Sequence, residues 1–137
     1  MPGGGTTTAP VDVDTGDVAG FGLTEIVVGG DTLTVALAET REQRGRGLRE
    51  VADIGDLAGM LFVWDEPTAS GFTMAQVPIE LDIAVLDADG VVLEAQKAIP
   101  CRQLRCPTYR FDARFLYAIE SPAGTLGLEP GEVVGLP

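Results

Sequence analysis

The chain has 137 residues and a net charge of −12, from 21 acidic and 9 basic side chains, and it contains no histidine. So large an excess of negative charge opposes binding to nucleic acid or to an anionic membrane surface. The absence of histidine excludes histidine-based acid/base catalysis, the usual serine and cysteine triads and the commonest zinc ligand. We therefore expect no nucleic-acid partner, no metal site and no cofactor.

Residues 1–20 are rich in glycine, threonine, proline and aspartate, a composition that cannot bury a core. They are predicted to form a flexible tail or linker ahead of a single β-rich domain, residues 21–137. A spacer of this kind resembles the linker after a cleaved export signal or lipid anchor, and a plain disordered terminus is the alternative. We expect an exported protein, periplasmic or extracellular, with a cytoplasmic location left open. An anchor upstream of the tail would be its one contact with a membrane.

Short runs of β-branched and aromatic residues between Gly, Pro and Asp clusters predict strands and turns along most of the remaining chain. Gly29-Gly30-Asp31 separates two such runs and predicts a hairpin. Asp89-Gly90 predicts a second, longer hairpin, whose first arm is apolar on both faces. The predicted strands cover residues 23–28, 33–38, 60–62, 72–74, 81–87, 91–99, 114–120 and 131–136.

A short helix is predicted to begin after Thr40. The Thr40 side chain can cap the first turn, and Gln43 completes a capping box. Gly45 and Gly47 weaken the helix, so it should span one to two and a half turns. Arg44 and Leu48 share a helix face, which would draw Arg44 toward the edge of the core.

An ordered set of motifs resembles the uncharacterised domain-of-unknown-function family 192. The resemblance covers about residues 30–136 and depends on Ala38, Thr40, Arg44, Gly47-Leu48, Gly59-Met60-Leu61-Phe62, Phe72, Met74, Pro78, Leu81-Asp82-Ile83, Asp89-Gly90, Tyr117, Glu120 and Pro122-Ala123-Gly124. It implies a compact, mainly β fold, barrel-like or sandwich, and no established activity. Together with the helix predicted after Thr40, we expect a small barrel-like or sandwich domain with one short helix. The chain departs from the family at residues 73–76, Thr-Met-Ala-Gln, where Trp-Met-Lys-Asn is frequent.

Cys101 and Cys106 are separated by four residues, which is not the Cys-x-x-Cys spacing of redox enzymes. A structural disulfide that closes this short loop fits an exported domain, and two free thiols are the alternative.

The basic residues form two groups along the chain, Arg41 to Arg49 and Arg102 to Arg114. These either pair with local carboxylates or form an anion-binding spot where the two groups meet.

Glu80 and Asp82 lie two residues apart at the start of a strand, where both side chains point to one face. They would form an acid/base pair in a hydrolase-like enzyme, with Arg44 steadying a substrate anion. Alternatively, Asp82 accepts backbone amides or pairs with an arginine. We expect Arg44 and Asp82 to lie within salt-bridge reach, because a partly buried charge needs a partner.

Met60, Trp64, Phe72 and Met74 gather around a predicted bend and either line a small apolar pocket or pack in the core. Together with Arg44 and Asp82 they are the candidate ligand-binding residues. We interpret the chain as a non-catalytic ligand-binding or interaction module of the cell envelope, which binds a small ligand or an envelope protein. The hydrolase-like enzyme and a purely structural role in a larger assembly are the alternatives.

Overall fold

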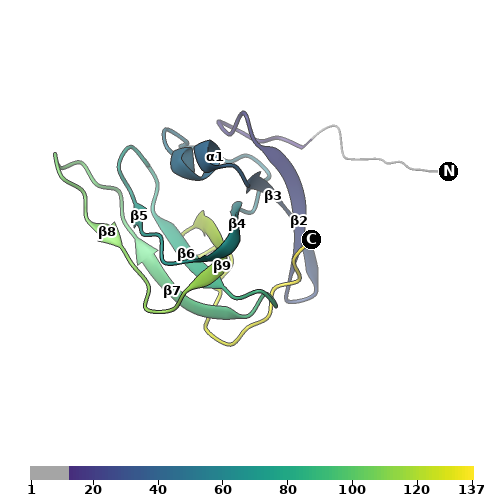
Figure 1. Ribbon diagram of the computed structural model, residues 1–137. Coiled ribbons are helices and arrows are strands. Elements are labelled where there is room, and N and C mark those ends of the chain that lie inside the picture. The colour runs from purple at the N-terminus through teal and green to yellow at the C-terminus, as the bar shows by residue number, and fades with distance from the viewer. Residues whose placement is uncertain (1–12) are drawn as a thin grey trace.

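A computed structural model describes residues 13–137 (Figure 1). Within this range a six-stranded sheet has the order β2-β3-β4-β9-β6-β7, and β5 and β8 form a small second sheet. The large sheet is not closed into a barrel, and the layers are sandwich-like. The mainly β prediction is therefore confirmed. The strands are β2 (Gly22–Val28), β3 (Asp31–Ala38), β4 (Met60–Thr68), β5 (Phe72–Thr73), β6 (Leu81–Leu86), β7 (Val92–Ala98), β8 (Thr108–Tyr109) and β9 (Phe115–Pro122).

Both predicted hairpins form. In the turn from β2 to β3, Gly29 and Gly30 have φ angles of 58° and 88°, which favour glycine at both central positions of a tight hairpin. In the turn from β6 to β7, the Asp87 carboxylate accepts the amides of Asp89 and Val91, both at 2.9 Å. These local bonds set the pairing of the strands that follow.

The connection from β3 to β4 carries the helix, because the two strands are parallel and need a crossover. Helix α1 (Arg41–Arg46) begins with the predicted capping box, in which the Thr40 hydroxyl accepts the Gln43 amide at 3.1 Å. It ends at Gly47, whose φ of 50° takes the chain out of the helix. After less than two turns the chain crosses one face of the sheet as a loop and enters β4.

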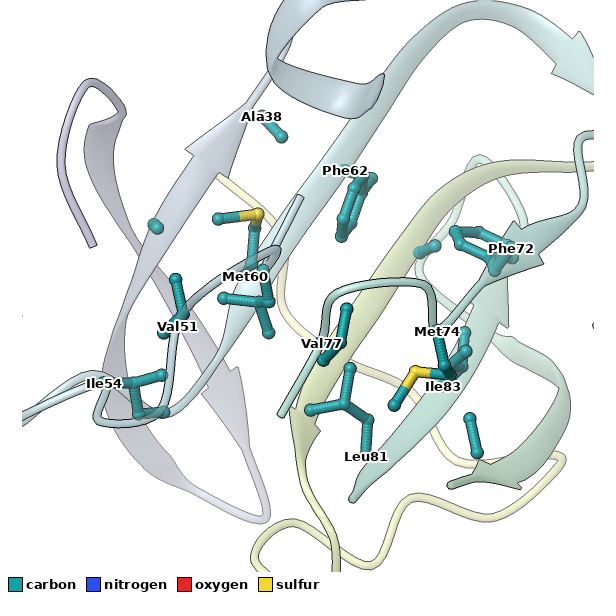
Figure 2. Packing of buried hydrophobic residues seen from close by; sticks show 14 of the residues in the cluster. Ala38, Val51, Ile54, Met60, Phe62, Phe72, Met74, Val77, Leu81 and Ile83 are labelled. Atoms are coloured by element: carbon teal, nitrogen blue, oxygen red, sulfur yellow. The ribbon is translucent and has the colours of Figure 1, made fainter. Parts of the chain in front are cut away.

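The sheet is covered on both faces. One cluster of buried side chains lies under α1, the loop that follows it and the β5 segment, and it includes Met60, Phe62, Phe72, Met74 and Leu81 (Figure 2). A second cluster on the other face includes Leu61, Leu86, Ile119 and Val134. Met60 and Leu61 contribute to opposite clusters because successive side chains of a strand point to opposite faces. The central strands β4, β9 and β6 are consequently buried on both sides.

The C-terminal segment runs back across the open sheet. Gly135 forms an antiparallel bridge to Val27 of β2, and Val133 forms one to Val91 beside β7. The predicted strand over residues 131–136 is thus reduced to two isolated bridges, one at each edge of the sheet. Val134, between them, is 1% exposed and packs in the second cluster.

Residues 13–20 differ from the expected flexible tail, and residues 1–12 lie outside the described range. Val18 is 6% exposed and belongs to the cluster under α1. The Asp17 carboxylate accepts the amides of Ala52 and Asp53 at 3.1 and 3.0 Å. Composition suggested a tail because it counts residue types, whereas one buried valine and one capping aspartate suffice to anchor the segment.

Two turns with the sequence Asp-x-Gly-Asp, residues 14–17 and 53–56, hold this segment in place reciprocally. The Asp17 amide donates to the Asp53 carbonyl, and the Asp56 amide donates to the Asp14 carbonyl, both at 2.7 Å. Gly16 and Gly55 have φ angles of 56° and 60°, and a Cβ on either would lie 2.2 or 2.3 Å from the facing carbonyl oxygen. Only glycine fits at the two positions where the turns meet.

The predicted disulfide is present. Cys101 and Cys106 are bonded, with their Cα atoms 5.7 Å apart, which is an ordinary separation for a disulfide. The bond closes the exposed loop between β7 and β8. Between residues 13 and 137, no helix is long and apolar enough to cross a membrane.

Candidate functional site

A hollow lies where α1 and the chain just after it face the β5 segment. Its deeper part, which we call the inner cavity, has a volume of about 250 Å³. Its walls are made by helix-side residues from Arg44 to Arg49 and by Phe62, Phe72 and Val77, with Glu120 also among the lining residues. Gly47 lies against the Phe62 ring, where a Cβ would make an ordinary contact at 3.4 Å.

A second hollow, the outer groove, adjoins the inner cavity and has a volume of about 460 Å³. Arg44, Gly45, Phe62, Gly71 and Phe72 line both spaces. The outer groove adds Arg41, Trp64 and Ser70 to its walls. The two hollows therefore adjoin along a shared wall, and together they form the candidate site, with an inner and an outer part.

Glu120 is the unusual residue of the inner cavity. It lies on β9 opposite Met60 of β4 and Ile83 of β6, so its side chain points to the face that carries the first core cluster. It is 6% exposed. Burial raises the pKa of the Glu120 carboxyl group to about 8, because removal from water disfavours the charged form. At neutral pH this carboxyl group is mainly protonated.

The Glu120 carboxyl group has no ion-pair partner among residues 13–137, and desolvation alone accounts for its raised pKa. Over the same residues, every side-chain oxygen that is fully buried has a hydrogen-bond partner. The Glu120 oxygens have no partner among the described side chains and amides, so they are not fully buried and must reach the cavity. A protonated carboxyl can both donate and accept a hydrogen bond there.

Arg44 is held at the junction of the two hollows, and the ion pair expected between it and Asp82 does not form. One guanidinium nitrogen, Nη1, donates to the carbonyls of Glu39 and Val63 at 2.8 and 2.9 Å. The guanidinium carbon lies 5.5 Å from the centre of the Trp64 ring. Backbone carbonyls and an aromatic face thus take the place of the acidic partner, which is a common arrangement for arginine.

The four apolar candidates divide into two pairs. Trp64 and Phe72 line the site, with ring centres 6.2 Å apart and nearly perpendicular. Met60 and Met74 are fully buried and line neither hollow; Figure 2 shows Met74 beside Val77 and Leu81 in the core. The methionines therefore support the walls without lining them.

The carboxylates of the hydrolase-like alternative have their own partners elsewhere. Asp82 accepts the Gly124 amide at 2.8 Å, as the non-catalytic interpretation of this residue anticipated. Glu80 lies 3.7 Å from the Lys97 ammonium, with both side chains about half exposed. Neither carboxylate lines the inner cavity or the outer groove. The catalytic trio of Glu80, Asp82 and Arg44 is consequently not assembled.

A third hollow, with a volume of about 690 Å³, borders the inner cavity on the side of the N-terminal segment. Arg46, Gly47 and Arg49 line both. Here the Arg46 guanidinium lies 4.4 Å from the Phe21 ring centre and donates to the Ala19 carbonyl.

The second arginine group, residues 102–114, lines none of the three hollows. Among residues 13–137 no three Cys, Asp or Glu side chains gather as a metal site would require.

The sequence-based candidates included Arg44, Trp64 and Phe72, but Glu120 was missed as a site residue. It entered only as part of the family motif near the end of a strand. The available signal was its spacing: Glu120 stands two residues after Ala118, so both must point to the same face of β9. A prediction of the buried face of β9 from this spacing would have placed the Glu120 carboxyl group in the core.

The family model described as an uncharacterised group, DUF192, matches residues 24–136. The chain therefore belongs to the DUF192 family. No curated protein matches the sequence.

Two crystal structures are similar to it. A protein of unknown function from Novosphingobium aromaticivorans DSM 12444 is 26% identical with a TM-score of 0.75, and the match covers 97% of this chain and 100% of that one. A protein of Sinorhizobium meliloti 1021, for which a role as a transcription regulator has been suggested, is 24% identical with a TM-score of 0.72, over 85% of this chain and 95% of that one. The second likeness shows the fold alone.

Proposed function

We propose that this protein is a non-catalytic binding module that takes a small molecule into the inner cavity and outer groove. The observation that carries the proposal is the Glu120 carboxyl group, which reaches the cavity with no partner from the described chain. Buried polar groups are normally hydrogen-bonded, because an unpaired one costs roughly 1–3 kcal/mol. A ligand, or water in its absence, would supply the missing partner.

The composition of the walls supports a binding role. Phe62, Phe72 and Val77 give the cavity apolar walls, and Glu120 and three arginines add polar groups. Small-molecule sites commonly combine apolar walls with a few polar groups that fix the orientation of the ligand. The nearest wall elements are tied down by bonds already described, such as those of Arg44 to two carbonyls. A largely preformed site loses little conformational freedom when a ligand enters.

Acid/base catalysis by Glu120 is the second candidate, and its favouring observation is the raised pKa of this group inside a cavity. Such a reaction needs a second group, a nucleophile or a base, within reach. The other side chains that line the inner cavity are arginines, apolar residues and Thr73. Binding therefore remains the better supported function.

Gly45 offers a direct test, because it lines both hollows and a Cβ there would meet no atom within 4 Å. Gly45→Leu should fill the site without disturbing the core. Gly22→Leu is the matched control, since Gly22 also faces open space and lines neither hollow. A library of small aromatic and aliphatic fragments, followed by saturation-transfer NMR, should give binders that Gly45→Leu loses and Gly22→Leu keeps. If no fragment distinguishes the two variants, the proposal fails.

We further propose that the module works outside the cytoplasm, in the cell envelope. The disulfide between Cys101 and Cys106 supports this, because such bonds persist in oxidising compartments. Rapid acid quenching of native cells, followed by thiol labelling, should find both sulfurs blocked and the protein in the envelope fraction. Two free thiols on a cytosolic protein would contradict the proposal.

A further inference from the structure

The two ends of the site differ in one chemical respect, which is that only the inner cavity has a carboxyl group in its walls. At the open end the outer groove is lined by Arg41 and Arg44, with Trp64 and Ser70, and it has no acidic side chain in its walls. At the closed end the inner cavity has Glu120 as its one acidic lining residue. The two ends must therefore recognise different groups of one ligand.

The open end favours an anion. Arg41 and Arg44 lie three residues apart on α1, where side chains share a face. Neither arginine has an ion-pair partner in the described chain, where the salt bridge found joins Lys97 to Glu80. In a protein of net charge −12, cations without carboxylate partners beside a cavity are suited to an anion supplied from outside.

The closed end favours an uncharged, hydrogen-bonding group. An anion would be repelled by the ionised form of Glu120, and a cation would be repelled by the three arginines that line the inner cavity, Arg44, Arg46 and Arg49. A hydroxyl or an amide meets neither obstacle and can pair with a carboxyl in its protonated form. Between the ends, Phe62 and Phe72 face the space with ring centres 5.9 Å apart, so the middle of the ligand should be apolar.

We propose that the site binds small amphipathic anions. An oxyanion, carboxylate or phosphate, is held by Arg41 and Arg44, an apolar body lies against Phe62 and Phe72, and a hydroxyl or amide reaches Glu120. The inner cavity of about 250 Å³ has room for a single ring, since a cavity of roughly 150 Å³ can hold benzene. The inference rests on the proposed binding function and names the class of ligand.

Four related probes separate the contributions of the two ends. The first, 4-hydroxyphenylacetate, has both groups. Phenylacetate lacks the hydroxyl, 4-hydroxyphenylethanol lacks the charge, and tyramine carries the opposite charge. Measured by NMR titration at pH 7, the dissociation constant of 4-hydroxyphenylacetate should be at least about tenfold lower than that of each other probe. Phosphate and carboxylate anions of similar size that lack a ring, tested in the same way, report which oxyanion the arginines prefer.

Variants locate the binding. Arg41→Gln should weaken the binding of 4-hydroxyphenylacetate severalfold and leave that of 4-hydroxyphenylethanol unchanged, because the oxyanion loses one of its two arginines and the neutral probe loses no partner. Arg41 makes no other described side-chain bond, so its removal should not disturb the fold. Arg102→Gln removes the same charge from an exposed residue away from the site and should change neither affinity. Glu120→Leu should erase the difference between 4-hydroxyphenylacetate and phenylacetate.

The outcomes distinguish the class of ligand from the binding function itself. If tyramine or 4-hydroxyphenylethanol binds as tightly as 4-hydroxyphenylacetate, and Gly45→Leu abolishes that binding, the site binds small molecules but the anion inference is wrong. If none of the four probes saturates by about 10 mM, the anion inference is also wrong, and the fragment test with Gly45→Leu still decides the binding function. Equal effects of Arg41→Gln and Arg102→Gln would overturn the role of the arginines.

Discussion

Replacing Glu120 by glutamine should remove a specific pH dependence from the stability of the fold. Below about pH 4.5, the ordinary value for this group, the carboxyl is protonated in both the folded and the unfolded chain. Between pH 4.5 and about 8, the folded chain keeps the proton and the unfolded chain releases it. Unfolding then releases a proton, so the free energy of unfolding falls as pH rises.

The size of the effect follows from the two pKa values. Each pH unit within that window lowers the free energy of unfolding by about 1.4 kcal/mol. From 4.5 to about 8 the total is about 5 kcal/mol, a large share of the 5–15 kcal/mol that holds a typical domain folded. Glutamine is uncharged at every pH. The free energy of unfolding of Glu120→Gln should therefore rise by this amount, relative to that of the natural chain, between pH 4.5 and about 8.

Urea unfolding, followed by the fluorescence of Trp64, can measure this between about pH 5 and pH 8.5. The quantity to plot is the difference in unfolding free energy between the natural chain and Glu120→Gln, because the titration of other groups cancels in it. Glu25→Gln, at an exposed position of β2, is the control and should give a difference independent of pH. A flat difference for Glu120→Gln as well, within about 1 kcal/mol, would refute the reasoning.

Three other results are expected. Val18→Ala should lower the free energy of unfolding by about 1–3 kcal/mol in urea titrations, because it leaves a cavity under α1. If stability is unchanged, Val18 does not anchor residues 13–20 in the core. Arg44→Met and Asp82→Asn should be additive within about 0.5 kcal/mol in a double-mutant cycle, because each has separate partners; a coupling of 2 kcal/mol or more would mean that they touch. Replacing Cys101 and Cys106 by serine should cost about 2 kcal/mol by the entropy of loop closure, whereas an unchanged melting temperature would make the bond dispensable.

The sequence was most informative where the deciding contacts are local. The hairpin glycines, the capping box at Thr40 and the Cys101–Cys106 bond each join residues at most five apart. Each can be recognised from a few neighbouring residues in the sequence, and all three formed as predicted.

The prediction was wrong for the ion pair of Arg44, and the burial of Glu120 was not predicted, because the surroundings of both come from distant segments. Arg44 was assigned an acidic partner, but the Val63 carbonyl and the Trp64 ring, about 20 residues away along the chain, take that role. Glu120 is buried because β9 is a central strand, flanked by β4 and β6. That neighbourhood is set by strand order, which one sequence does not reveal.

The reciprocal Asp-x-Gly-Asp turns should open together as one unit. Each turn has a bond of its own, from Gly16 to Asp14 and from Gly55 to Asp53, but the bonds between the turns are exchanged reciprocally, so the two turns should lose them together. Regions of this kind open locally at a lower free energy than the whole fold. The amides of Asp17 and Asp56 should then exchange with solvent at matching rates, faster than those of β9. Because Asp17 lines the third hollow beside Arg46 and Arg49, we expect this opening to remove part of the wall of that hollow while the sheet stays intact.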